Sequence, residues 1–321
     1  MPQAIIIRTI KAHTTFVVTM HVNPDPDALG AALAMTLFLR SLGKKAYLIN
    51  ESPCPSWLRF MPQSRACKPF RASLVKKIKP EVVIVLDCGD IRRIGQVAQL
   101  TGPGVKIINI DHHVTNTLFG DQNLVQAKQS STSEILYGFL KAARCKFTRD
   151  IAVLLYLGIL TDTGSFGFDC TSTHTHRVIA ELLKFDLPVG ELYRQVYETM
   201  PKKDLKSFLA LMNTLTLHHD DKVACLTITK KQAAKLSDGF DLKDKIFGFL
   251  RAVKGIEVIM ILTEQEKKKT RLNFRSRGKV DVARFASRFN GGGHRNASGG
   301  FLDMPLARAG ACVLKEIAKA L

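Results

Sequence analysis

The sequence predicts an α/β protein, with a doubly wound, mainly parallel sheet, a smaller α/β domain after it and a cleft between the two. Three observations support this fold class. Strand-like and helix-like segments alternate through the first part of the chain, as in parallel sheets. Residues 82–86 and 105–110 are apolar throughout, as expected for strands buried on both faces. After a helical stretch, a second group of strand-like runs is followed by helices.

The individual elements follow from local patterns. Residues 28–42 form a predicted helix, which Asp27 opens and Gly43 closes. The other elements predicted in the first part are strands at 16–21, 46–49, 82–86 and 105–110, and helices at 74–78, 132–143 and 150–160. Those predicted in the last part are strands at 223–228, 258–262 and 270–274, and helices at 282–289 and 305–321. The predicted domains are 1–187 and 218–321, with a helical connector at 188–217.

Composition narrows the class of protein. A chain of 321 residues with 46% hydrophobic residues can form two real cores. The longest apolar run, 151–160, is half the length that crosses a bilayer, and the N-terminus has no signal-peptide pattern. Seven scattered cysteines fit a reducing compartment. We therefore expect a cytoplasmic protein without membrane contact. The formal charge of +19 favours polyanionic partners such as nucleotides and RNA.

Acidic and imidazole side chains follow several of the apolar runs. Asp111, His112 and His113 come directly after residues 105–110, at the carboxyl end of a strand, where open α/β sheets bind ligands. The same kind of position is expected for the other members of the set, which are His21, Asp25, Asp27, Asp87 and Asp162. Carboxylates with a minority of imidazoles suit Mn²⁺ or Mg²⁺ better than Zn²⁺. Singly, each acid is as well explained by a helix cap or a turn, but together they can hold two divalent ions.

A glycine-rich segment in the last part predicts an anion-binding loop. Gly291, Gly292 and Gly293 precede His294 and leave main-chain N–H groups unobstructed, as in anion-binding nests. Arg275 lies on or near a predicted strand facing this loop, and arginine makes forked contacts with phosphate.

These motifs, in this order, resemble the DHH family of phosphoesterases with its associated C-terminal domain, and most of all its nanoRNase/pAp-phosphatase branch. The resemblance implies that His21 and Asp25 hold one metal ion, that Asp27, His112 and Asp162 hold a second, and that Asp87 bridges both. It also implies that Asp111 orients His112, that His113 contacts the phosphoryl group, and that Arg275 and His294 hold the substrate with the glycines. The ions it implies are Mn²⁺, with Mg²⁺ or Co²⁺ as alternatives.

The function implied is hydrolysis of short RNA oligonucleotides and of the 3′-phosphate of pAp-like nucleotides. Three alternatives remain at this point: a phosphodiesterase for cyclic di-AMP or pApA, a single-strand exonuclease, and an inorganic polyphosphatase. An alternative from another class is a nucleotide-binding protein on an inactive scaffold. The sequence does not decide between a monomer and a homodimer.

Overall fold

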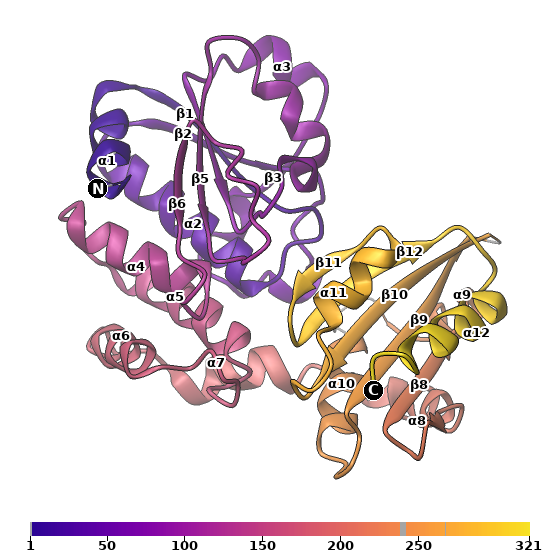
Figure 1. The fold of residues 1–321 in the computed structure, drawn as a ribbon. Helices are drawn as coiled ribbons and strands as arrows, with labels where there is room; N and C mark the ends of the chain where they lie inside the picture. Colours follow the sequence, from indigo (N-terminus) through magenta and orange to yellow (C-terminus); the bar gives the residue numbers. More distant parts are fainter. Residues whose placement is uncertain (1, 238–241, 267) are drawn as a thin grey trace. The chain divides into compact units, whose positions relative to one another are not determined.

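The computed structural model describes residues 2–237, 242–266 and 268–321. The chain forms two compact units, Met1–Glu198 and Thr199–Leu321 (Figure 1). The segment predicted as a connector, 188–217, contributes its first helix, α7 (Val189–Tyr197), to the first unit, and α8 (Leu205–Met212) to the second. The predicted domain limits at residues 187 and 217 stay predictions.

The first unit contains a six-stranded sheet in the order β3-β2-β1-β4-β5-β6, and every pair of neighbouring strands is parallel. Its strands are β1 (Thr15–Met20), β2 (Lys45–Asn50), β3 (Lys68–Pro69), β4 (Val82–Leu86), β5 (Lys106–Asp111) and β6 (Gln122–Val125). This confirms the predicted mainly parallel sheet. The strand order reverses between β1 and β4, and such a reversal opens a ligand-binding crevice at the carboxyl ends of the strands.

Helices cover both faces of this sheet because each central strand is apolar on both sides. Phe16 and Val18 of β1 join the core beneath α2 (Pro26–Ser41), α4 (Thr132–Ala142) and α5 (Arg149–Asp162). Val17 joins the opposite core, with the 3-10 segment η3 (Ile91–Leu100). The unit also contains α1 (Pro2–Ala12), α3 (Ser73–Lys77), α6 (Thr173–Leu183) and two short 3-10 turns, η1 (Ser56–Leu58) and η2 (Ser64–Ala66).

The N-terminus of α2 differs from the prediction. Asp25, and not Asp27, caps the helix, because the Asp25 side chain accepts a hydrogen bond from the main-chain N–H of Ala28 at 2.9 Å. Pro26 occupies the first helical turn, where its missing N–H costs nothing. The helix therefore begins at Pro26, and Asp27 lies inside its first turn with a side chain that is free to serve elsewhere.

The second unit has a mixed six-stranded sheet in the order β11-β12-β10-β9-β8-β7. Only the β8–β9 pair is parallel among the described pairs of this sheet. The strands are β7 (Thr216–His218), β8 (Val223–Ile228), β9 (Val258–Glu266), β10 (Lys269–Ser276), β11 (Gly292–His294) and β12 (Ala297–Leu302). One core lies with α11 (Val282–Ala286), η5 (Ser287–Phe289) and α12 (Leu306–Ile317), and the other with α8 and α10 (Leu242–Arg251). The unit also includes η4 (Lys202–Asp204) and α9 (Lys230–Ala233).

Candidate metal centre

The predicted site residues of the first unit gather where the strand order reverses. Met20 of β1 pairs with Leu86 of β4, and Leu86 pairs with Ile110 of β5. The residues after these three are His21, Asp87 and Asp111, and they therefore lie side by side at the carboxyl edge of the sheet. All three are buried, so the chain places polar groups inside the protein at this edge.

Asp87 lies at the centre of the cluster. Its Oδ2 is 3.4 Å from Nε2 of His21, and its Oδ1 is 3.5 Å from Nε2 of His112. The two oxygens of one carboxylate thus face imidazoles that come from two different strand ends. Asp87 also has a positive φ of 56°, a conformation that is uncommon outside glycine and that occurs at functional sites.

Two further carboxylates complete two groups around Asp87. Oδ2 of Asp25 is 3.5 Å from Nε2 of His21, and Oδ2 of Asp162, the last residue of α5, is 3.2 Å from Nε2 of His112. Candidate ligand atoms of His21, Asp25 and Asp87 all lie within 4.8 Å of one another, as do those of Asp27, Asp87 and His112. The structure therefore brings all six predicted ligands together, in two groups that share Asp87. Their ligation of metal stays a prediction.

The charges in this cluster fit cations. Burial and the other carboxylates raise the pKa of both Asp27 and Asp162 well above the usual range. Burial alone would lower the pKa of His21, but Asp25 and Asp87 outweigh it and raise that pKa to about 10. Burial would raise the pKa of Asp87, but the hydrogen bond from His21 and the charges of His113 and His112 hold it well below its usual range. Buried carboxylates that share one site repel each other, and divalent ions bound between them would relieve that repulsion.

Asp111 forms its hydrogen bond with a different histidine from the one predicted. Nδ1 of His113, and not a ring nitrogen of His112, lies 2.7 Å from Oδ1 of Asp111. The other oxygen of Asp111 accepts a hydrogen bond from Asn116 Nδ2 at 2.6 Å. Alternate residues of an extended chain point to the same side, so Asp111 meets the residue two positions on. The predicted orientation of His112 by Asp111 is therefore wrong, and the main chain of Gln129 hydrogen-bonds His112.

One contact to the cluster was not predicted. The polar run from Ser130 to Glu134 is buried, and its Thr132 donates a hydrogen bond to Oδ1 of Asp87 at 2.9 Å. One signal for this segment was available in the sequence: Ser131 and Glu134 have the spacing of a helix-capping box. The side chain of Ser131 does cap α4, by accepting from the N–H of Glu134.

In the second unit, Arg275 and His294 lie in one row across the sheet. Arg275 of β10 and His294 of β11 both pair with Ala297 of β12, so they point to the same face, about 9–10 Å apart at the main chain. The guanidinium carbon of Arg275 lies 4.5 Å from the ring centroid of Phe247, as in a cation–π contact. The motif therefore presents a cation and an imidazole on one surface.

The expected glycine loop is instead part of a hairpin. Gly292, Gly293 and His294 form β11 and pair with Gly299, Ser298 and Ala297 of β12. Gly293 has a φ of +143°, and a Cβ built there would lie 2.5 Å from the carbonyl oxygen of Ala297. Gly293 is needed for this close strand pairing, and the prediction of an anion-binding loop is wrong because the segment forms a strand.

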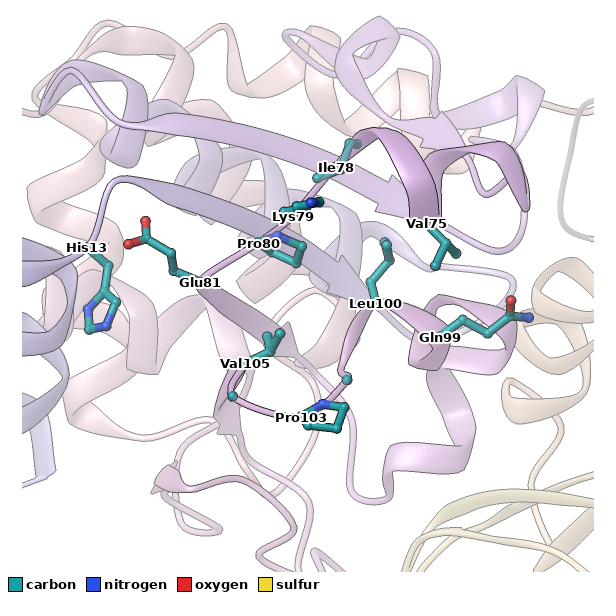
Figure 2. A pocket seen from close by; sticks show the side chains of 12 residues that line it. His13, Val75, Ile78, Lys79, Pro80, Glu81, Gln99, Leu100, Pro103 and Val105 are labelled. Atoms are coloured by element: carbon teal, nitrogen blue, oxygen red, sulfur yellow. The ribbon is translucent and has the colours of Figure 1, made fainter.

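The first unit also has a hollow, and Figure 2 shows the side chains that line it. It has a volume of about 640 Å³. Its lining includes His13, Glu81 and Val105, which lie just before the first residues of β1, β4 and β5, respectively. The metal cluster is at the carboxyl ends of the same strands, so the hollow lies at the opposite edge of the sheet.

Comparisons with known proteins place the chain in a family. Residues 15–159 match the DHH family, N-terminal domain, and residues 241–318 match the DHHA1 domain. The bifunctional oligoribonuclease and PAP phosphatase NrnA of Thermus thermophilus is 30% identical over 288 residues, which are 89% of this chain and 83% of that protein. The chain belongs to the DHH family. The DHH match covers His21 through His113, and the DHHA1 match covers Arg275 and the glycine run.

Two further proteins are similar to this chain over most of its length. The protein of the same name from Bacillus subtilis is 31% identical over 301 residues, covering 92% of this chain and 91% of its own. The crystal structure of an exopolyphosphatase-related protein from Bacteroides fragilis has a TM-score of 0.88 at 25% identity, covering 98% of this chain and 96% of that one. The DHH family is metal-dependent, and the acidic and histidine cluster has the donor atoms for metal. None of the described helices has both the length and the apolar character needed to span a membrane.

Proposed function

We propose that this chain is a two-metal phosphoesterase that hydrolyses short RNA oligonucleotides and removes the 3′-phosphate of pAp-like nucleotides. One observation carries the proposal: the carboxylate of Asp87 faces His21 with one oxygen and His112 with the other. A carboxylate shared between two donor groups is suited to a pair of closely spaced ions. The names of the Thermus thermophilus and Bacillus subtilis relatives support the two substrates.

The proposed ligands divide into two sets. His21 and Asp25 would hold one ion, Asp27, His112 and Asp162 the other, and Asp87 both. Oxygen donors with imidazole favour Mn²⁺, with Mg²⁺ and Co²⁺ as alternatives. Ions bound there would make a water molecule nucleophilic at neutral pH and neutralise charge on the phosphoryl oxygens.

His113 would act on the substrate. Its Nδ1 lies 2.7 Å from Oδ1 of Asp111, which holds the imidazole ring in one orientation beside the cluster. Burial would lower the pKa of His113, but the hydrogen bond that His113 donates to Asp111 and the charge of Asp87 outweigh it and raise that pKa. The ring would therefore donate a hydrogen bond to the oxygen that gains negative charge in the reaction.

Arg275 and His294 would hold the nucleotide or a phosphate remote from the bond that is cut. Arg275 and His294 share one face of the second unit's sheet, and arginine suits forked contacts with phosphate. A site that recognises a phosphate or nucleotide near the end of its substrate favours short substrates. This preference supports short oligonucleotides and pAp over long strands.

The proposal is tested by measuring kcat/KM with Mn²⁺ for pAp, a dinucleotide, a 20-mer RNA, cyclic di-AMP and polyphosphate. We expect pAp and the dinucleotide to be hydrolysed fastest. Asp87→Ala should abolish every activity, whereas Asp303→Ala, which changes an exposed acid of the second unit, should alter none. A preference for the 20-mer, cyclic di-AMP or polyphosphate would contradict the proposed substrates. No hydrolysis of any of them, with nucleotide binding retained, would indicate a binding protein.

A further inference from the structure

The N-terminus of α4 contacts two carboxylates of the metal cluster at once. Both oxygens of Asp27 accept main-chain hydrogen bonds, from the N–H of Thr132 and from that of Ser133, each at 2.8 Å. The hydroxyl of Thr132 donates to Oδ1 of Asp87 at 2.9 Å. One residue, Thr132, therefore bonds a carboxylate from the start of α2 with its main chain and a carboxylate from the end of β4 with its side chain.

The hydrogen bond from Thr132 distinguishes the two oxygens of Asp87. The last side-chain torsion of aspartate is broad and is not fixed by local sterics. In this site Oδ1 lies toward Thr132 and His112, and Oδ2 lies 3.4 Å from His21. A carboxylate that bridges two ions through both of its oxygens would need one oxygen directed toward each ion. The Thr132 hydroxyl selects the orientation of the carboxylate that meets this requirement.

The segment that carries Thr132 is itself held firmly. The buried carboxylate of Glu134 accepts hydrogen bonds from the N–H and hydroxyl of Ser130 and from the hydroxyl of Thr175 in α6. On the other side, α5 packs closely at Gly158, where a Cβ would lie 2.1 Å from Ser133 Oγ and 2.5 Å from Asp27 Oδ1. Main chain, side chains and a neighbouring helix thus fix the start of α4 against the cluster.

We propose that Thr132 is a positioning residue of the metal centre, which orients Asp87 through its hydroxyl and Asp27 through its main-chain N–H. The inference rests on the proposed two-metal function. Removing the hydroxyl leaves Oδ1 of Asp87 without this donor, so that the carboxylate is held less firmly about its last torsion. Hydrogen-bonding partners of metal ligands typically affect metal affinity by about 10- to 100-fold.

The experiment compares Thr132→Val, Thr132→Ala and Thr132→Ser in the full chain. The valine variant keeps the shape and loses the donor, the alanine variant fits without any clash, and the serine variant keeps the donor. Thr36→Val is the matched control, because Thr36 is also buried in a helix and its hydroxyl bonds only the carbonyl of Ala32 among the described residues. Mn²⁺ stoichiometry and affinity are measured by titration calorimetry, with thermal unfolding to confirm that each variant is folded.

We expect Thr132→Val and Thr132→Ala to lose about 10- to 100-fold in affinity for at least one Mn²⁺ ion. Thr132→Ser and Thr36→Val should bind Mn²⁺ like the wild type. If folded valine and alanine variants bind both ions with wild-type affinity, the inference is overturned. An equal loss in Thr132→Ser would overturn it too, because the methyl group and not the hydroxyl would then matter. A wild-type chain that does not bind two ions would contradict the proposed function itself.

Discussion

The two units differ in which charged side chains they bury. The first unit buries Asp27, Asp87 and Asp111 with three histidines at one edge of its sheet. Among the described residues of the second unit, Asp204 is the only buried acid, and it accepts a hydrogen bond from the N–H of Ser237. The second unit instead places Arg275 and His294 on one partly exposed face. Buried carboxylates are suited to binding the metal ions proposed for hydrolysis. An accessible cationic side chain is suited to binding an anionic group of the substrate.

The different sheets explain this contrast. Parallel strands end together at one edge, so the residues after β1, β4 and β5 converge on a single point. In the mostly antiparallel second sheet, neighbouring strands end at opposite edges, and groups converge only across a row of paired residues. Substitutions in each unit should therefore affect different measurements.

The largest expected effect is in the first unit. Asp87→Ala should abolish turnover while the protein stays folded, because one carboxylate serves both proposed ions and no neighbour can replace it. Activity on pAp and the melting temperature are measured together. Near-normal turnover in the folded variant would remove Asp87 from the centre of the site.

The two adjacent histidines should separate binding from chemistry. His113→Ala should keep both metal ions and lose about 10²- to 10³-fold in kcat, as for one lost donor in the transition state. His112→Ala should lose metal, because its Nε2 faces Asp87 and Asp162. Metal content and single-turnover rates are the measurements. Loss of metal in His113→Ala but not in His112→Ala would show that the two roles are exchanged.

In the second unit, Gly293 and Gly292 offer a matched pair. Gly293→Ala should destabilise the protein by about 1–3 kcal/mol, because its positive φ and its contact with Ala297 leave no room for a side chain. Gly292→Ala should change stability by less than about 0.5 kcal/mol, since a Cβ there meets nothing within 4 Å. Urea unfolding of both variants gives the comparison. Similar losses in the two would contradict the strand pairing of β11.

The smallest effect concerns an acid of the first unit outside the cluster. Glu81, at the opposite edge of the sheet (Figure 2), accepts hydrogen bonds from the main chain of Thr14 and Thr15 and from the Thr14 hydroxyl, which lower its pKa to about 2. A lowered pKa stabilises the fold above the unfolded value near 4.5 and loses that stabilisation as the pH falls toward 2.

Because Glu81 is exposed and screened, Glu81→Gln should lower the unfolding free energy at pH 7 by less than about 1 kcal/mol. The difference from the wild type should shrink between pH 4.5 and pH 2, and pAp hydrolysis at pH 7 should be unchanged. Thermal unfolding across this range is the measurement. A difference that grows as the pH falls would have the wrong sign for this explanation.

The positions of the site residues could be predicted because they depend on chain order and strand direction. Asp87 and Asp111 follow apolar strands, and parallel strands bring such residues together. Side-chain partners could not be predicted in the same way. The pairing of Asp111 with His113 depends on which way alternate residues point, and the cap of α2 depends on the turn at Pro26.

Two other features could not be predicted from local sequence patterns. The local pattern at Thr132 indicates only the start of a helix. Its hydrogen bond to Asp87 joins residues 45 positions apart, so no local pattern could reveal it. The strand pairing of Gly293 depends on β12, which follows it and had no strand signal of its own. The choice of Mn²⁺ and the cytoplasmic location stay predictions, and the choice between a monomer and a homodimer stays open, because they concern the protein's surroundings and not its fold.

The division of labour between the units is tested most directly by comparing Arg275→Ala with Asp87→Ala on two substrates. One is pAp, and the other is bis-p-nitrophenyl phosphate, which has no remote anion to hold. Asp87→Ala should abolish hydrolysis of both. Arg275→Ala should lower kcat/KM for pAp by roughly 10- to 100-fold, as for one charge-assisted contact, and leave hydrolysis of bis-p-nitrophenyl phosphate almost unchanged. Equal losses on both substrates in a folded Arg275→Ala protein with normal metal content would place Arg275 in the chemical step and contradict the account.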